Sequence, residues 1–239
     1  MRIMAAVDLR GGAAVQLVGG RPEVEPIRLA DPAAVARHWV DAGFRHIHVV
    51  DLDAALGTGS NSPSIQAIAR ELDGAASLQV GGGIRGDDAV ARALALGADR
   101  VVVGTRGVED RPWLEAIAGA HGGRVVLAAD VAGGVVLTRG WTRATGRDAV
   151  AFLRELDGLP LAGVLVTDVD REGRQAGIDV ALFRRLRDAT THPLIVAGGV
   201  SSAVDLEELD RIGAAGAVLG MALYTGRIEP AEALALETT

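Results

Sequence analysis

The chain repeats itself about halfway along its 239 residues, and this repeat constrains the fold more than any other feature. An Asp that ends an apolar run, followed three residues later by Gly-Gly, occurs at Asp8 and again at Asp130. A Gly-Gly pair that follows a later apolar run occurs at Gly82 and again at Gly198. Internal similarity of this kind is typical of an architecture that duplicates one unit. Here the unit is half of the chain, so we expect the matched carboxylates to face each other across one site.

Short apolar runs rich in β-branched residues alternate with amphipathic stretches along the chain. The apolar runs predict eight strands, at residues 3–7, 46–50, 77–80, 100–103, 125–129, 164–167, 194–197 and 217–219. The amphipathic stretches predict helices at residues 33–42, 64–72, 87–96, 112–120, 147–156, 180–189, 203–212 and 230–236. Residues 13–18 and 135–138 are predicted to form additional hairpin segments after the first and fifth strands.

This alternation favours a parallel sheet, because strands joined through helices form right-handed crossover units. Eight such units in a chain of this length fit a closed barrel. We therefore predict an α/β fold, a single (β/α)8 TIM barrel domain that spans residues 1–239 and consists of two similar half-barrels. The alternative is an open doubly wound sheet, whose first strand would be followed by Gly-x-Gly-x-x-Gly. The residues that follow the first strand, Asp8 to Gly12, do not match that pattern.

The composition argues against several classes of function. A formal net charge of -7 disfavours nucleic acid as a partner, since a phosphate backbone attracts positively charged surfaces. The chain has no cysteine, which excludes disulfides, thiolate catalysis and cysteine-based zinc sites. No charged segment followed by a long apolar stretch marks a secretory signal, and no apolar run approaches the ~20 residues of a membrane span. We expect a cytoplasmic protein that does not interact with membranes.

Two carboxylates are the candidate catalytic groups. Asp8 ends the first predicted strand and Asp130 ends the fifth, and the active sites of such barrels lie at the carboxyl ends of the strands. The first and fifth of eight strands are opposite each other, which suits general acid and base catalysis on two sides of one substrate. An Asp after a strand can instead cap the following turn. The matched positions of these two residues favour catalysis, and Thr167, at the end of the sixth strand, can add a hydrogen bond.

Glycines at the same ends of the strands indicate phosphate binding. Glycine lets backbone N–H groups approach an anion closely, and the following helix presents its positive end. The loops after strands seven and eight are the usual phosphate site of these barrels, and the repeat predicts a second site after strands three and four. A single Gly pair is more often a tight turn, but two pairs in register favour a substrate with a phosphate at each end. The glycines concerned are Gly82, Gly83 and Gly104 in the first half, and Gly198, Gly199 and Gly220 in the second.

Further candidates lie in the loops and at the strand ends. Arg85 can add a charged contact to phosphate, and Trp141 can stack on a planar heterocycle or pack as a hydrophobic lid. His48 lies inside the second strand, where a structural role is the commoner one. Asp51 and Asp168 can bind sugar hydroxyls or cap their loops. The remaining candidate contacts to substrate or phosphate are Gly19, Thr105, Gly173 and Gly177.

Metal binding has little support in the sequence. Asp51 with Asp53, or Asp168 with Asp170, could hold Mg²⁺. The chain has no His-x-x-x-His pair or His-rich cluster for zinc. We therefore expect no metal.

Motifs across nearly the whole chain resemble one known family. They are Ala6-Val7-Asp8-Leu9 with its Gly-Gly, the run from His48 to Asp53, the run from Gln79 to Arg85, the run from Arg100 to Thr105, Asp130 with Gly140-Trp141, Thr167-Asp168 with Arg171-Glu172-Gly173, and the run that starts at Ala197. Together they resemble the phosphoribosylformimino-5-aminoimidazole carboxamide ribotide isomerases of histidine biosynthesis. The cyclase subunit of imidazole glycerol phosphate synthase shares the half-barrel duplication. The Asp51-Leu52-Asp53 and Gly140-Trp141 segments look like the isomerase rather than the cyclase.

The resemblance implies an activity and residue roles. The reaction is an Amadori rearrangement of an aminoaldose ribotide to an aminoketose, on a small-molecule substrate with two phosphates and without a cofactor. By matching motif, Asp8 is the base that removes the C2′ proton, and Asp130 is the acid that protonates the ribose ring oxygen. Thr167 assists near the reacting sugar, and Trp141 covers the imidazole. A monomer is expected.

Three positions depart from the family pattern. Many relatives have Arg where this chain has Gln16, many read Asp-Gly-Thr where it has Glu172-Gly173-Arg174, and many have Lys or Arg where it has Met221. Three alternatives therefore stay open. The enzyme could also isomerise phosphoribosyl anthranilate, it could be a cyclase-type subunit, or it could be a sugar-phosphate-binding barrel without catalysis. The presence of both aspartates argues against the last of these.

Overall fold

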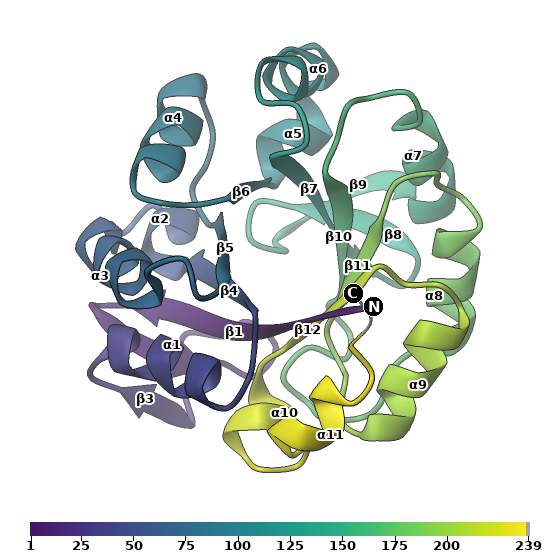
Figure 1. Cartoon of the computed structure of the whole chain (residues 1–239). Helices are drawn as coiled ribbons and strands as arrows, with labels where there is room; N and C mark the ends of the chain where they lie inside the picture. The colour runs from purple at the N-terminus through teal and green to yellow at the C-terminus, as the bar shows by residue number, and fades with distance from the viewer. Residues whose placement is uncertain (238–239) are drawn as a thin grey trace.

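The predicted strands form and pair in parallel around a closed ring. The structure is a computed structural model that describes residues 1–237. Within these residues, β12 pairs with β1 and closes a ring in the order β1, β4, β5, β6, β7, β10, β11, β12, so the predicted TIM barrel is confirmed (Figure 1). Its strands are β1 (Arg2–Arg10), β4 (His46–Asp51), β5 (Ser77–Gly81), β6 (Arg100–Val103), β7 (Val125–Ala132), β10 (Gly163–Asp168), β11 (Leu194–Ala197) and β12 (Gly216–Leu219).

Alternation along each strand divides the buried side chains into two cores. Successive side chains of a strand point to opposite faces. On β1, Ile3 and Val7 belong to the large core between the barrel and the helices, whereas Met4 and Ala6 belong to a smaller core inside the barrel. The barrel interior is therefore filled by small and medium apolar side chains beneath its open end, which leaves room above them for a ligand.

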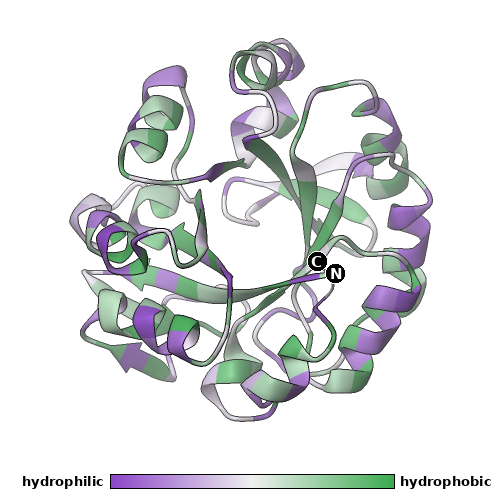
Figure 2. Cartoon of the chain, in the orientation of Figure 1, coloured by the Kyte–Doolittle hydropathy of each residue, from purple (hydrophilic) through white to green (hydrophobic). Residues whose placement is uncertain are grey.

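Helices form an outer ring around the barrel and turn their apolar faces toward it (Figures 1 and 2). Local signals start them, as at Asp31, whose carboxylate accepts hydrogen bonds from the N–H groups of Ala33 and Ala34 beside a proline in the first turn. Within the described residues, none of the helices combines the length and the apolar character that a membrane crossing requires. The outer helices are α1 (Pro32–Asp41), α3 (Ser62–Leu72), α4 (Asp87–Ala95), α6 (Arg111–Ala120), α7 (Ala149–Glu155), α8 (Val180–Arg187), α9 (Ala203–Arg211) and α11 (Pro230–Leu234).

The first and fifth loops carry antiparallel additions to the barrel. The predicted hairpin segments are confirmed as β2 (Ala13–Gln16) and β8 (Val135–Thr138). Each pairs with one more strand that the sequence did not predict, β3 (Ile27–Leu29) and β9 (Arg143–Asp148). The predicted helix start at Arg147 is wrong. Residues up to Asp148 pair with β8, and the Asp148 carboxylate then caps α7 by accepting the N–H of Ala151.

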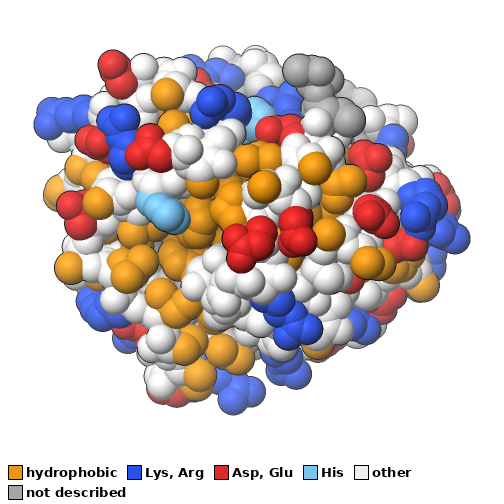
Figure 3. Space-filling model, turned by 60° about the horizontal axis from the view of Figure 1, so that its bottom comes forward, with side chains coloured by type: hydrophobic (Ala, Val, Ile, Leu, Met, Phe, Trp, Pro, Cys, Tyr) orange, Lys and Arg blue, Asp and Glu red, His pale blue; other side chains and the backbone are white. Residues whose placement is uncertain are grey.

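Three short helices also lie directly after barrel strands, where the sequence showed too few turns to predict them. They are α2 (Leu52–Leu56), α5 (Thr105–Glu109) and α10 (Met221–Tyr224). The last two occupy equivalent places in the two halves. On the face seen in Figure 3, basic and acidic side chains are interspersed around a hydrophobic centre.

Candidate active site

A cavity of about 310 Å³ opens at the carboxyl ends of the barrel strands. Every strand of the ring contributes to its wall, for example Asp8 from β1, Asp130 from β7 and Val218 from β12. Loops complete the rim, with Leu17 from the first loop, and Trp141 from the fifth. The volume is at the lower end of the range for small-molecule sites, and the wall mixes apolar side chains with a few polar groups.

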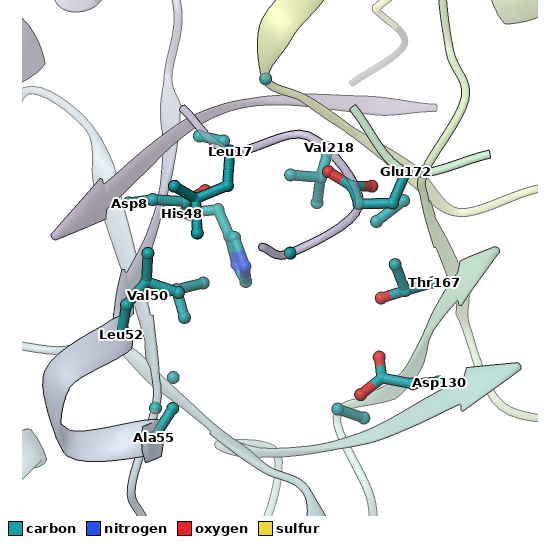
Figure 4. A pocket seen from close by; sticks show the side chains of 18 of the residues that line it. Asp8, Leu17, His48, Val50, Leu52, Ala55, Asp130, Thr167, Glu172 and Val218 are labelled. Atoms are coloured by element: carbon teal, nitrogen blue, oxygen red, sulfur yellow. The ribbon is translucent and has the colours of Figure 1, made fainter. Parts of the chain in front are cut away.

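Asp8 and Asp130 lie on opposite sides of this cavity (Figure 4). Four strand-to-strand steps separate β1 from β7 in a ring of eight, within the described residues. Thr167 lies beside Asp130 because the two are register partners on β10 and β7. The predicted catalytic residues are therefore brought together around one space, with room for a substrate between the two carboxylates.

The environment raises the pKa of both aspartates. Removal from bulk water disfavours the charged form of a carboxyl group. Burial raises the pKa of Asp8 from 3.8 to about 7. Burial also raises the pKa of Asp130, although hydrogen bonds from Thr167 and Trp141 act in the opposite direction. The value for Asp8 lies near neutral pH, and the pKa of Asp130 is shifted in the same direction, as acid–base catalysis requires.

Glu172 is a third carboxylate in the cavity, and it is not among the site residues predicted from the sequence. It lies in the loop after β10 and points toward the cavity beside Val218 (Figure 4). The N–H of Gly19 donates to the backbone oxygen of Glu172 at 3.1 Å and holds this loop against the first one. Burial, followed by the nearby charges of Asp8, Asp130 and Asp168, raises the pKa of Glu172 to about 8. The only sequence signal was its departure from the Asp-Gly-Thr pattern.

The two glycine pairs have the same backbone geometry in both halves of the barrel. A Cβ atom on Gly82 would lie 2.2 Å from the carbonyl oxygen of Asp51, and one on Gly198 would lie 2.6 Å from that of Asp168. Their φ angles are 97° and 87°, values that a residue with a side chain rarely adopts. Only glycine therefore allows these loops to pass so close to the neighbouring strand end. Gly83 and Gly199, which follow them, also line the cavity.

The last glycine of each candidate phosphate site, Gly104 or Gly220, has the same backbone conformation in both halves of the barrel. Gly104 precedes α5 with φ -107° and ψ -111°, and Gly220 precedes α10 with φ -108° and ψ -108°. Both line the cavity. The internal repeat seen in the sequence thus extends to individual backbone angles, and it gives the cavity two similar glycine-lined ends.

Arg85, Thr105, Trp141 and Gly173 also line the cavity. The Arg85 guanidinium donates to the carbonyl of Ala55, which holds it at the rim. Thr105 accepts a hydrogen bond from the N–H of Arg139 and so connects the fourth loop to the fifth. The ring of Trp141 packs so closely over Gly20 that a Cβ atom there would lie 2.2 Å from it.

Four predicted site residues lie outside the cavity wall. Asp51 accepts hydrogen bonds from the N–H groups of Ala54 and Asn61, and Asp168 forms an ion pair with Arg171 at 3.5 Å. These contacts match the loop-capping alternative for both aspartates. Gly19 and Gly177 make backbone contacts that hold the Glu172 loop. Among residues 1–237 there is no group of three or more His, Asp or Glu side chains arranged to hold a metal ion.

Comparison with known proteins identifies the family. Residues 2–229 match the family model described as "Histidine biosynthesis protein". The chain belongs to this family. It is 48% identical over 229 residues to a protein of Gemmatimonas aurantiaca, with 96% of each chain covered, and 48% identical over 237 residues to one of Myxococcus xanthus, with 99% of each covered.

A relative from Nocardioides sp. is 42% identical over 241 residues, which cover 99% of this chain and 96% of the relative. All three relatives are named 1-(5-phosphoribosyl)-5-((5-phosphoribosylamino)methylideneamino)imidazole-4-carboxamide isomerase. The resemblance that the motifs indicated is confirmed at the level of the histidine biosynthesis family.

Proposed function

We propose that this protein is the isomerase that converts the aminoaldose ribotide of histidine biosynthesis to its aminoketose by an Amadori rearrangement. The observation that carries the proposal is the pair of opposed carboxylates, Asp8 and Asp130, in one cavity with matched glycines at its two ends. The relatives' name contains two phosphoribosyl groups, so a substrate of that kind has a phosphate for each glycine-lined end.

In this proposal the two aspartates have the roles that the family resemblance implies, and their positions on opposite sides of the cavity support one acid and one base. Asp130 donates a proton to the ribose ring oxygen, the ring opens, and a Schiff base forms. Asp8 then removes the proton from C2′, and the resulting enolamine rearranges to the ketone. A base with a pKa of about 7 is ionised in part at neutral pH and still binds a proton strongly. Burial raises the pKa of Asp130, which favours the protonated form that the first step needs.

Binding of both phosphates contributes through orientation. Gly82 with Gly104, and Gly198 with Gly220, would hold the two ends of the substrate so that the sugar carbon lies between the carboxylates. A reactant that is already fixed in this way loses less entropy when it reaches the transition state, so the barrier is lower. Trp141 lies at the cavity rim beside Asp130, which supports the proposal that it covers the imidazole of the substrate.

The proposal has further parts that concern partners and location. The Schiff base makes the C2′ proton acidic enough for a carboxylate, so no cofactor is required. We propose that the protein acts in the cytoplasm, as a monomer, and on a small molecule alone. Nucleic acid and membranes are not partners in this proposal.

The test is a rate measurement with the purified aminoaldose ribotide, monitored by absorbance. It compares the parent protein with the Asp8→Asn and Asp130→Asn variants. We expect each substitution to lower the rate at least about a hundredfold, within the range for general acid–base groups. Asp188→Asn, at an exposed position outside the cavity, is the matched control and should keep the parental rate.

Retention of near-parental turnover in both cavity variants would overturn the assigned roles. Ligand binding by Asp8→Asn, measured by calorimetry, distinguishes lost chemistry from lost folding. Parallel assays with phosphoribosyl anthranilate report whether the site accepts a second ribotide.

A further inference from the structure

His48 and Gln79 form a buried polar pair beneath the catalytic carboxylates. The two are register partners on β4 and β5. On β1, Ala6 is the partner of His48 and Asp8 is the partner of Val50, so the pair lies one layer deeper in the barrel than Asp8. His48 nevertheless lines the cavity, and its ring points into it (Figure 4). Gln79 Nε2 lies 2.8 Å from His48 Nδ1.

Hydrogen-bond accounting favours this orientation of the Gln79 amide. With Nε2 toward His48, one of its two N–H groups is paired, while the second N–H group and Oε1 have no partner in the described part of the chain. The reversed amide would place both N–H groups of Nε2 where Oε1 now lies, without an acceptor. A buried carbonyl without a donor is less rare in proteins than a buried N–H group without an acceptor. Gln79 is therefore the donor, and His48 Nδ1 is the acceptor.

The protonation state of His48 then follows. Burial lowers the pKa of the His48 imidazole to about 4, so the ring is neutral at physiological pH. A neutral imidazole carries one proton, and the nitrogen that accepts a hydrogen bond does not have it. The proton is therefore on Nε2. No hydrogen-bond partner for Nε2 lies among residues 1–237, and the ring borders the cavity.

We propose that Gln79 is a positioning residue that holds His48 in the neutral Nε2–H tautomer, so that this N–H donates a hydrogen bond to a sugar oxygen of the substrate from the floor of the cavity. The substrate part of this inference rests on the proposed function, whereas the tautomer does not. A neutral N–H group can stabilise an oxygen that gains negative charge during the rearrangement, without itself transferring a proton.

The tautomer is measured directly by long-range ¹H–¹⁵N NMR of the parent protein. The chain has five histidines, and the His48→Gln variant assigns the His48 signals by their loss. His192 is an internal reference, because its Nε2 lies 2.9 Å from the carbonyl oxygen of Leu156 and must be protonated to donate. We expect His48 to show a protonated Nε2 and an unprotonated Nδ1. A protonated Nδ1 would overturn the inference.

Kinetics of Gln79 variants measure the consequence for catalysis. In Gln79→Glu, a carboxylate can only accept, so it draws a proton to Nδ1 and removes the imposed tautomer. We expect kcat to fall about a hundredfold with little change in KM, as for other donors to a developing charge. Gln79→Met removes the donor without adding charge and should lower kcat less. If both variants fold and keep the parental kcat, the positioning role is excluded.

A double-substitution test separates positioning from simple packing. His48→Gln retains an N–H donor on a side chain that has no tautomers. In that background, the change Gln79→Met should have almost no further effect on kcat, because the two residues act as one unit. An equal loss of kcat in both backgrounds would mean that Gln79 acts through packing alone, which contradicts the inference.

The two proposals fail in different ways. If the parent protein does not convert the ribotide but His48 has the expected tautomer, the proposed function fails and the Gln79–His48 arrangement stands. If the parent protein is active but Nδ1 is protonated, the inference fails and the proposed function stands.

Discussion

At the scale of single residues, the cavity is defined by carboxyl groups whose pKa values are all raised. Asp8, Asp130 and Glu172 border one cavity, and the pKa of Glu172 is raised first by burial and then by the nearby charges of Asp8 and Asp130. Groups coupled in this way titrate as a set. Burial raises the pKa of each of these carboxyl groups, in the direction that the proposed acid–base chemistry requires.

We expect kcat/KM to depend on pH on both sides of neutrality. On the acid side, the rate falls as pH drops through about 7, since Asp8 must be ionised to remove a proton. On the alkaline side, the rate falls as pH rises through about 8, because ionised Glu172 adds a negative charge beside the phosphorylated substrate and the other carboxylates. A pH series of initial rates measures both limbs.

Glu172→Gln is the control for the alkaline limb. An amide stays neutral at every pH, so the inflection near pH 8 should disappear while the acid limb remains. An unchanged alkaline limb in this variant would assign that limb to another group, of which Asp130 is the next candidate.

At the scale of elements, each half-barrel uses glycine to bring a loop against the end of the neighbouring strand. Gly82 and Gly198 have positive φ angles and leave no room for a Cβ atom next to backbone that cannot move aside. The residues that follow these turns, Gly83 and Gly199, line the cavity. Gly119 differs, since it lies exposed in α6 with open space at its Cβ position.

We therefore expect opposite effects of alanine at Gly198 and Gly119. Gly198→Ala should lower the free energy of unfolding by about 1 to 3 kcal/mol, because the residue must keep a conformation that alanine disfavours. Gly119→Ala should raise it by up to about 0.5 kcal/mol, because Gly119 lies in the last turn of α6 with a φ that alanine adopts freely. Urea denaturation of both variants measures the difference, and destabilisation by both would contradict the assignment of Gly119 to an unstrained helix.

At the scale of the whole molecule, the two half-barrels form one cavity with two similar ends, and a single ligand can contact both. The matching backbone angles before α5 and α10 are the clearest evidence of this symmetry. The hairpins β2–β3 and β8–β9 also occupy equivalent loops. The twofold relation predicts how a ligand lies, with its length across the cavity from one glycine pair to the other.

Crystals grown with phosphate or sulfate should therefore contain two anions in the cavity. One is expected near Gly82 and Gly104, and the other near Gly198 and Gly220. The physical reason is that glycine-rich turns expose backbone N–H groups to an anion. A single anion position at saturating concentration would contradict a substrate held at both ends.

The sequence by itself determined the barrel and its two principal aspartates. Strand and helix periodicities are local properties, and the half-chain repeat placed Asp8 and Asp130 at equivalent strand ends. Other features depended on contacts between distant segments. The position of Glu172 follows from packing of its loop against the first loop, and the orientation of His48 follows from Gln79 on the next strand.

The same distinction explains the prediction that was wrong. Residues 143–148 have no strong pattern of their own, and they form β9 because β8 offers its free edge. Pairing of this kind is decided by the neighbouring strand rather than by the segment's own residues. The sequence pattern thus predicted a residue's position wherever that position depends on its own strand or helix. Contacts between segments that are distant in the sequence were decided only by the tertiary structure.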